Sequence, residues 1–361
     1  MNLSIPLPTQ PTNLSMPKKI FAIYDLNIMP CSIGDIISFI AAIQLRRYSN
    51  NMDSYDICFI ANCNKDSGNL FNMLINKHNR LHYLLKLVDT LQISTDLESI
   101  HYCHDYVEFY ELYKVKKSGG SLVWPELSAI QEKEYLHYRI YAELHFFKQE
   151  FGLLPSVFNS SPLTQWAHTF FGNNICPFLP VTVNLRNNKL FCSHRNALIE
   201  SWLGFFSHCL NIFPVQFIVI CAKSEIDERL YHHPNVIIAK TFNTSIAQDV
   251  ALIANSLLHL GSASGPATIS PFVAHPSLIT NCDMVPYMEH YNGALQFYRD
   301  DMHVRFSFSN ELQYYSTFPE TTEYLINEFE KMWDAVDTSA WQKNSNYWQN
   351  LKSEAVLSWL D

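Results

Sequence analysis

The segment CSIGD, at residues 31–35, has side chains that could move a proton. It follows an apolar stretch and precedes a run whose apolar residues recur at helical spacing. Gly34 lets the chain turn, and it lies between Ser32 and Asp35 at the expected helix start. The Asp35 carboxylate can cap the free N–H groups of that helix. It can equally act as a general base that takes a proton from a hydroxyl group.

An arginine follows a second apolar stretch, in VNLRNN at residues 183–188. Arg186 can hold a diphosphate through bidentate, charge-assisted hydrogen bonds, although an ordinary surface arginine would look the same. Arg195 lies at an expected helix start, where the helix dipole disfavours a cation. A bound phosphate would offset that cost, so Arg195 also favours an anion site, to which His194 could contribute.

The third segment is GSASG, at residues 261–265, between an apolar stretch and an expected helix near Pro266. Small residues let the backbone approach a ligand closely, and N–H groups at a helix start attract phosphate. Ser262, Ser264 and Gly265 are therefore candidate donors to a diphosphate. A tight strand-to-helix turn that holds no ligand is the alternative.

Asp249, on the helix expected before this loop, could bind a ribose or a base, but a solvated helix face is the more ordinary position. The fingerprints of dinucleotide-binding, P-loop, serine-hydrolase and zinc-protease sites are absent from the sequence. The pairs at 232–233 and 300–301 (HH and DD) fit turns better than a metal site. We therefore expect neither a metal nor a cofactor.

Strand–helix–strand signals must position these segments, and they occur in both halves of the chain. In the first half they cover residues 19–26, 36–48 and 55–62. In the second half they cover residues 181–185, 195–211 and 215–222. The repetition predicts an α/β protein with two Rossmann-like, doubly wound domains facing each other across a cleft.

A stretch rich in proline and glycine, near 155–178, marks the expected domain boundary. We place the N-terminal domain at 1–165, with a loose tail at 1–17, and the C-terminal domain at 175–335. Residues 336–361 carry three tryptophans on an amphipathic pattern. They are expected to form a helical segment that packs back on the N-terminal domain.

The composition fits a folded protein that acts away from nucleic acid. Hydrophobic residues make up 48% of the chain, and its net charge is −9. The nine cysteines form no CxxC pair, which predicts a cytoplasmic protein without disulfides or a zinc site. The sequence has neither a signal-peptide pattern nor an apolar run of about 18 residues, so any membrane contact would be peripheral.

In the order of these segments the chain resembles the GT-B glycosyltransferases. The SIGD segment and its apolar helix are similar to a loop of the ADP-heptose heptosyltransferases, which implies that Asp35 is the catalytic base. VTVNLRNN resembles the strand end of the fucosyltransferases whose arginine grips the donor diphosphate, which would be Arg186; Asn184 stands where those enzymes often have histidine. The stretch LGSASGPATISPFVAHPSLITN resembles the segment that lines the nucleotide diphosphate in both groups, which adds Asn281 as a weaker nucleotide contact.

The resemblance implies a metal-independent, inverting glycosyltransferase that takes part in polysaccharide biosynthesis. Its donor would be a nucleotide-diphosphate-sugar, and its acceptor a hydroxyl group of a glycan, a lipid-linked molecule or a protein. Two other functions remain compatible with the residues. One is a GT-B nucleotide-sugar epimerase or hydrolase, which needs no acceptor, and the other is a nucleotide- or glycan-binding module without turnover.

Overall fold

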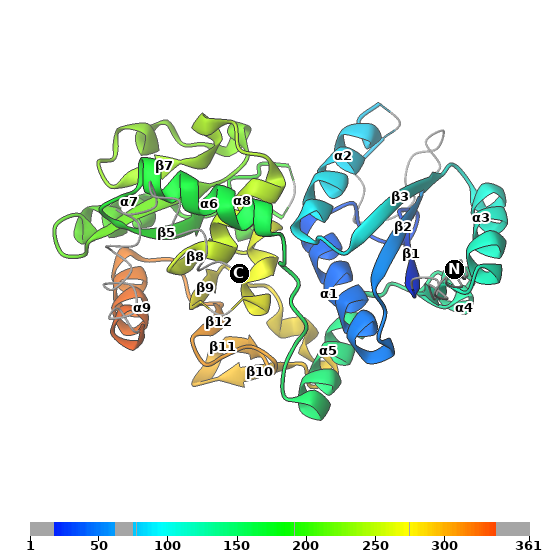
Figure 1. Ribbon diagram of the computed structural model, residues 1–361. Coiled ribbons are helices and arrows are strands. Elements are labelled where there is room, and N and C mark those ends of the chain that lie inside the picture. Colours follow the sequence, from blue (N-terminus) through cyan, green and yellow to red (C-terminus); the bar gives the residue numbers. More distant parts are fainter. Residues whose placement is uncertain (1–17, 62–74, 77, 191, 274, 337–361) are drawn as a thin grey trace, which may run out of the picture.

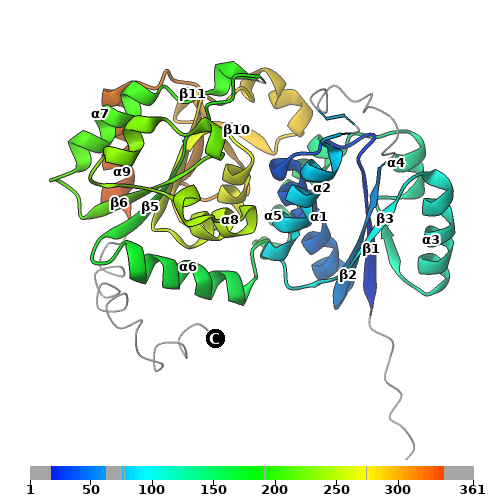
Figure 2. The ribbon, with the colours of Figure 1, turned by 90° about the horizontal axis from the view of Figure 1, so that it is seen from above.

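The computed structural model describes residues 18–61, 75–76, 78–190, 192–273 and 275–336. Within these ranges the chain forms two α/β domains that lie side by side (Figures 1 and 2). The expected tail at 1–17 lies outside the described residues. The expected terminal helix at 336–361 lies outside them as well, apart from its first residue.

The N-terminal domain is built on a four-stranded parallel sheet with the order β3-β2-β1-β4. Its strands are β1 (Lys19–Asp25), β2 (Ser54–Ile60), β3 (Leu97–Cys103) and β4 (Leu122–Trp124). Its helices are α1 (Ile33–Asn50), α2 (Arg80–Thr90), α3 (Tyr106–Ser118), α4 (Leu127–Gln131) and α5 (His137–Phe151). Every residue of β2 is buried, because helices cover both faces of the sheet, with α1 and α2 on one side and α3 on the other (Figure 1).

The C-terminal domain has an eight-stranded sheet with the order β10-β11-β12-β9-β8-β5-β6-β7. Its strands are β5 (Leu179–Asn184), β6 (Val215–Ile220), β7 (Val236–Ile238), β8 (Leu258–Ser262), β9 (Ser277–Thr280), β10 (Leu295–Tyr298), β11 (Asp300–Phe306) and β12 (Gln313–Ser316). Its α-helices are α6 (Ser161–Asn174), α7 (Ile199–Cys209), α8 (Ile246–Asn255) and α9 (Thr322–Ala335). Strands β10 and β11 are antiparallel additions at one edge, and the other neighbouring strands are parallel.

Two sequence-based boundaries were wrong. The helix expected near Pro266 is a 3-10 helix, η7 (Pro266–Phe272), which contains Pro271. The helix expected from Arg195 begins only at Ile199. Arg195 instead ends a short 3-10 turn, η3 (Ser193–Arg195). The argument from a helix dipole therefore does not apply at either position.

The two domains share one apolar core. Helix α1 packs on η7, α2 on α8, and α5 on η8 (Val285–Tyr291). The same buried cluster contains Phe39 and Ile40 of α1 together with Val250 and Ile269 of the C-terminal domain. A polar contact crosses the interface as well, because the Asp89 carboxylate accepts from the backbone N–H of Ile246 at 2.6 Å. A negative charge at the N-terminus of α8 is favourable, so Asp89 joins the domains as well as capping the helix.

Candidate functional site

Asp35 lies in the first turn of α1, at the face of the N-terminal domain that meets the C-terminal domain. Ser32 is the N-cap of this helix, since its Oγ accepts from the Asp35 N–H at 3.1 Å. The Ser32 hydroxyl also donates to Asp35 Oδ2 at 2.5 Å. The hypothesis that Asp35 itself caps the helix is therefore wrong. Its side chain keeps 14% of its surface exposed.

The other carboxylate oxygen of Asp35 meets two side chains that the sequence analysis missed. His137 Nδ1, at the start of α5, lies 3.2 Å from Asp35 Oδ1, and the Tyr135 hydroxyl lies 3.4 Å from the same atom. His137 Nε2 lies 3.2 Å from the hydroxyl of Tyr291, which belongs to the C-terminal domain. The only sequence signal for this cluster was the aromatic and histidine-rich character of the two segments.

The tyrosines around Asp35 stay protonated. Burial raises the pKa of Tyr135 above its ordinary value, and the Asp35 carboxylate raises it further. Burial likewise raises the pKa of Tyr291, and neighbouring Tyr141 and Tyr138 add to the shift. These hydroxyl groups are therefore hydrogen-bond donors at neutral pH.

Arg186 and Arg195 lie on the C-terminal side of the interface. The Arg186 N–H donates to Ser262 Oγ at 3.0 Å, and Arg195 Nη2 donates to the Ala263 carbonyl at 3.0 Å, so both arginines are tied to the 261–265 loop. Burial lowers the pKa of Arg186, and the nearby Arg195 charge lowers it further. Two cations that disfavour each other beside one loop would be stabilised by a bound anion.

Carboxylate and imidazole groups border this pair of arginines. Asp283 Oδ1 lies 3.9 Å from Arg195 Nε, and Asp283 Oδ2 lies 3.1 Å from His194 Nε2. All three side chains are partly exposed to solvent. A carboxylate and an imidazole therefore lie at the edge of the candidate anion site, beside Arg195.

The residues of the 261–265 loop have different surroundings. The Ser262 hydroxyl is buried, where it accepts from Arg186 and donates to the Asn184 carbonyl. Ser264 lines the interdomain cavity, and its Oγ has no hydrogen-bond partner in the part of the chain that the structure describes. Gly265 touches the N-terminal domain: a Cβ placed on it would lie 2.9 Å from Ile33 Cβ. Of these three residues, Ser264 is the one with a side chain placed to reach a ligand.

Two weaker candidates lie farther from the cavity. Asp249 is only 3% exposed, so the expectation of a solvated helix face was wrong. Its carboxylate pairs with Lys240 at 2.5 Å and accepts from the Thr244 hydroxyl at 2.6 Å, and burial raises its pKa to about 6. Asn281 follows β9 in a left-handed conformation with φ 52°, and its amide donates to the Asn196 carbonyl at 2.8 Å. Asn281 therefore supports the loop that carries Arg195.

A cavity of about 180 Å³ lies between the two domains and connects the His137 cluster with Arg195 and Ser264. Its lining includes His137 and Tyr141 from α5, and Arg195, Ser264 and Asp283 from the C-terminal domain. Ligand pockets usually measure roughly 300–1,000 Å³, so a whole nucleotide-sugar would extend beyond this space. Asp35 lies one hydrogen bond behind the wall, through His137.

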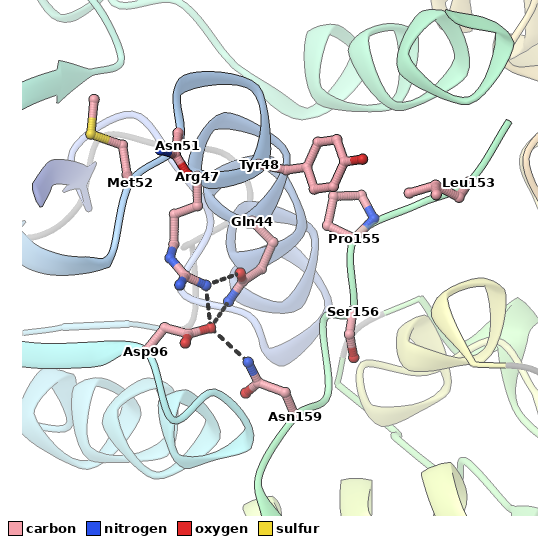
Figure 3. A pocket seen from close by; sticks show the side chains of 10 residues that line it. All are labelled: Gln44, Arg47, Tyr48, Asn51, Met52, Asp96, Leu153, Pro155, Ser156 and Asn159. Atoms are coloured by element: carbon pink, nitrogen blue, oxygen red, sulfur yellow. Dashed lines mark hydrogen bonds and ion pairs between the residues drawn. The ribbon is translucent and has the colours of Figure 1, made fainter. Parts of the chain in front are cut away.

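A larger hollow, of about 660 Å³, lies at the opposite end of α1 (Figure 3). Its charged groups already bind one another: the Asp96 carboxylate pairs with Arg47, and accepts from Gln44 at 3.0 Å and from Asn159 at 2.6 Å. Because these charged groups already pair with one another, we assign no ligand to the hollow. The network ties the segment between α5 and α6 to the N-terminal domain.

Two searches for other kinds of site were confined to the described ranges. They contain no group of three or more His, Cys, Asp or Glu side chains placed to hold a metal ion. They also contain no helix with the length and apolar character needed to cross a membrane.

Two facing α/β domains with a cavity between them give this chain a GT-B glycosyltransferase-like structure. The Escherichia coli heptosyltransferase WaaC with ADP has the same fold, with a TM-score of 0.50 at 8% identity over 87% of this chain and 99% of that one. WaaC with ADP-2-deoxy-2-fluoro heptose gives a TM-score of 0.47 at 9% identity over 88% and 99% of the two chains. The E. coli ADP-heptose lps heptosyltransferase II gives 0.45 at 11% identity over 87% and 98%.

No family model matches the sequence, and no curated protein matches it. The match to WaaC with ADP thus shows a shared fold, at an identity too low to carry over an activity. The function must be argued from the site.

Proposed function

We propose that this protein is a metal-independent glycosyltransferase that moves a sugar from a nucleotide-diphosphate-sugar to a hydroxyl group of a glycan, lipid-linked or protein acceptor. One observation carries the proposal: a single interdomain cavity joins Arg195 and Ser264 to His137, the partner of Asp35. An anion site and a potential base thus face each other across the domain interface.

In the proposed reaction, Asp35 takes the proton of the acceptor hydroxyl as its oxygen forms a bond to the anomeric carbon of the donor. The bond between that carbon and the diphosphate breaks, and its electron pair leaves with the nucleotide diphosphate. Attack from the face opposite the leaving group inverts the anomeric centre. Asp35 lies on the N-terminal domain and the arginines on the C-terminal domain, which suits attack and departure on opposite sides.

Arg186 and Arg195 stabilise the leaving diphosphate with fixed positive charge. This charge takes the place that a metal ion has in other sugar transfers. Burial and the neighbouring Arg195 charge lower the pKa of Arg186, and a bound diphosphate would offset the repulsion between the two guanidinium groups. Ser264 adds a hydroxyl donor from the same loop. Nucleotide contacts from Asn281 and Asp249 remain weaker proposals, because both side chains already bind protein groups.

The first experiment is a thermal-shift titration with ADP, UDP, GDP and CMP. ADP comes first because a structure of WaaC, which shares the fold, holds ADP. Ligand at about 100 times its Kd stabilises the folded protein by about 2.7 kcal/mol, which shifts the Tm by roughly 4 °C for a chain of 361 residues. If no nucleoside diphosphate shifts the Tm, the donor site is wrong.

The second experiment measures release of the nucleotide diphosphate from the matching nucleotide-sugar, with and without a hydroxyl acceptor. Release that depends on the acceptor, with a new glycosidic bond, supports transfer. Equal turnover without acceptor would make the protein an epimerase or hydrolase. Tight binding without turnover under either condition would make it a binding module.

A further inference from the structure

Asp35 is held by hydrogen bonds that also restrict which atoms of His137 carry hydrogen. An ionised carboxylate only accepts hydrogen bonds, so the ring nitrogen that faces Asp35 Oδ1 at 3.2 Å must be the donor. A neutral imidazole then has Nε2 as its acceptor, and this atom takes the hydroxyl hydrogen of Tyr291 at 3.2 Å. The positions of the hydrogens on His137 and Tyr291 are thus assigned from the hydrogen-bond network. They give a chain of donors that runs from Tyr291 through His137 to Asp35.

Aromatic side chains fix the His137 ring in the orientation that this chain needs. The Tyr135 ring stacks on it with an interplanar angle of 8° and a centroid distance of 5.6 Å. The rings of Tyr138 and Tyr141 approach it at 5.3 and 5.0 Å. A ring enclosed in this way has little freedom to rotate, so the donor nitrogen stays aimed at the carboxylate.

The far end of the chain belongs to the other domain. Tyr291 ends η8 of the C-terminal domain, is only 4% exposed, and packs against α5. His137 and Asp35 both belong to the N-terminal domain. The bond from Tyr291 to His137 therefore exists only while the two domains hold this arrangement.

We propose that His137 is a positioning residue for Asp35, and that Tyr291 completes its alignment only when the domains are closed around the donor. This inference rests on the proposed glycosyl transfer. Donor binding on the C-terminal domain and deprotonation on the N-terminal domain would thereby be coupled, since the base is held in place by a residue from the donor side.

Two substitutions at His137 separate the two ends of the chain. His137→Asn places an amide nitrogen near the position of Nδ1, so it keeps a donor for Asp35. His137→Gln places its amide near Nε2, so it keeps a group for Tyr291 but loses the donor to Asp35. We expect His137→Gln to lower kcat about 10- to 100-fold, because a misplacement of about 1 Å can cost about 100-fold. We expect His137→Asn to avoid most of that loss, and KM for the donor to change less than kcat in both variants.

Tyr291→Phe removes only the hydroxyl group. It should lower kcat about two- to tenfold, the range for one hydrogen bond between neutral groups. A matched control lies on the same helix: His145 Nδ1 bonds the Ser307 hydroxyl of the C-terminal domain at 2.5 Å, two turns from His137. His145→Asn also perturbs a histidine–hydroxyl contact across the interface, so it reports the cost of loosening the domains. Equal kcat in the Asn and Gln variants at His137, or an equal loss in His145→Asn, would overturn the proposal.

A spectroscopic measurement tests the same alignment without turnover. With 15N-labelled histidine, the two-bond nitrogen–proton pattern of His137, assigned from its absence in His137→Asn, should show the Nδ1–H tautomer. Asp35→Ala should remove that preference. An Nε2–H tautomer in the unsubstituted protein would refute the proposed alignment even if sugar transfer is observed. The absence of transfer, with the Nδ1–H tautomer present, would refute the proposed function and leave the alignment of Asp35 supported.

Discussion

Substitution of Arg195 by alanine separates a binding role from a structural one. In the folded protein Arg195 donates to the Ala263 carbonyl at 3.0 Å and lies 3.9 Å from Asp283, a pair whose side chains are 28% and 41% exposed. Solvent-exposed pairs of this kind contribute about 0–1 kcal/mol. We therefore expect Arg195→Ala to lower the free energy of unfolding by no more than about 1 kcal/mol, which is roughly 1–2 °C in Tm.

The expected loss of donor affinity is larger. A hydrogen bond to a charged group is worth about 1.5–3 kcal/mol. Since each 1.4 kcal/mol is a factor of ten in Kd, the affinity for the nucleoside diphosphate should fall about 10- to 100-fold. Calorimetric titration with the best nucleotide from the thermal-shift screen measures this Kd directly, and chemical unfolding measures the stability of the same sample.

Three further variants make the measurement specific. Arg195→Lys keeps the charge but loses the planar fork, so its Kd should lie between those of the alanine variant and the unsubstituted protein. Asp283→Asn removes the carboxylate beside Arg195 and should tighten diphosphate binding. Arg229→Ala removes an exposed arginine of the same domain, paired with Asp227 and Glu200, and should leave Kd unchanged. An Arg195→Ala protein with unaltered Kd would remove Arg195 from the donor site.

Three other predictions follow from the structure. Asp35→Asn should abolish most transfer and keep nucleotide binding; near-normal turnover in a transfer assay would exclude Asp35 as the base. Gly265→Ala brings a methyl group to within 2.9 Å of Ile33 Cβ, an overpacking that should cost about 1–3 kcal/mol, measured by chemical unfolding, and lower kcat because the domains no longer close. His259 is fully buried, and its burial, with a contribution from His275, lowers its pKa to about 3. The unfolded chain, with a His pKa of about 6.5, binds more protons as the pH falls below that value, so this stability is present above pH about 6.5 and is lost at about 1.4 kcal/mol per pH unit toward pH about 3. Between pH 7.5 and pH 5, the free energy of unfolding should therefore fall by about 2 kcal/mol less in His259→Asn than in the unsubstituted protein. The Asn amide can still meet the Thr182 hydroxyl. Equal losses in the two proteins would contradict the assignment.

Strands β1, β2, β5 and β6 and the helix α1 could be predicted from the sequence because their signals are local. The run that became α1 has apolar residues at helical spacing between Ser32 and Asn51, which the structure shows as its caps. The same reasoning failed near Pro266, where a proline within the segment restricts it to 3-10 turns. It also missed the antiparallel strand β10, whose pairing with β11 contains a register shift.

The site was predictable only where a residue follows a strand. Asp35 and Arg186 could be selected because loops at the carboxyl ends of parallel strands carry ligands. His137 and Tyr291 could not, because they are 154 positions apart and their contact depends on how the domains pack. Asp249 was placed on a solvated face because its helix was considered alone, whereas Lys240 and Thr244 enclose it in the folded chain.

The polar network around Asp96, at the far end of α1, determines where the two domains can rotate relative to each other. Asn159 is bonded to Asp96 of the N-terminal domain, whereas α6 begins at Ser161 and packs on α8 of the C-terminal domain. The joint between the rigid parts is therefore about one residue long, and α1 acts as a lever with 12 residues, or about 18 Å, between Arg47 of the polar network and Asp35. A rotation of about 10° at the joint would move the Asp35 end by about 3 Å. The two domains would thus separate most at Asp35, where the donor has to enter, with almost no displacement at Asn159.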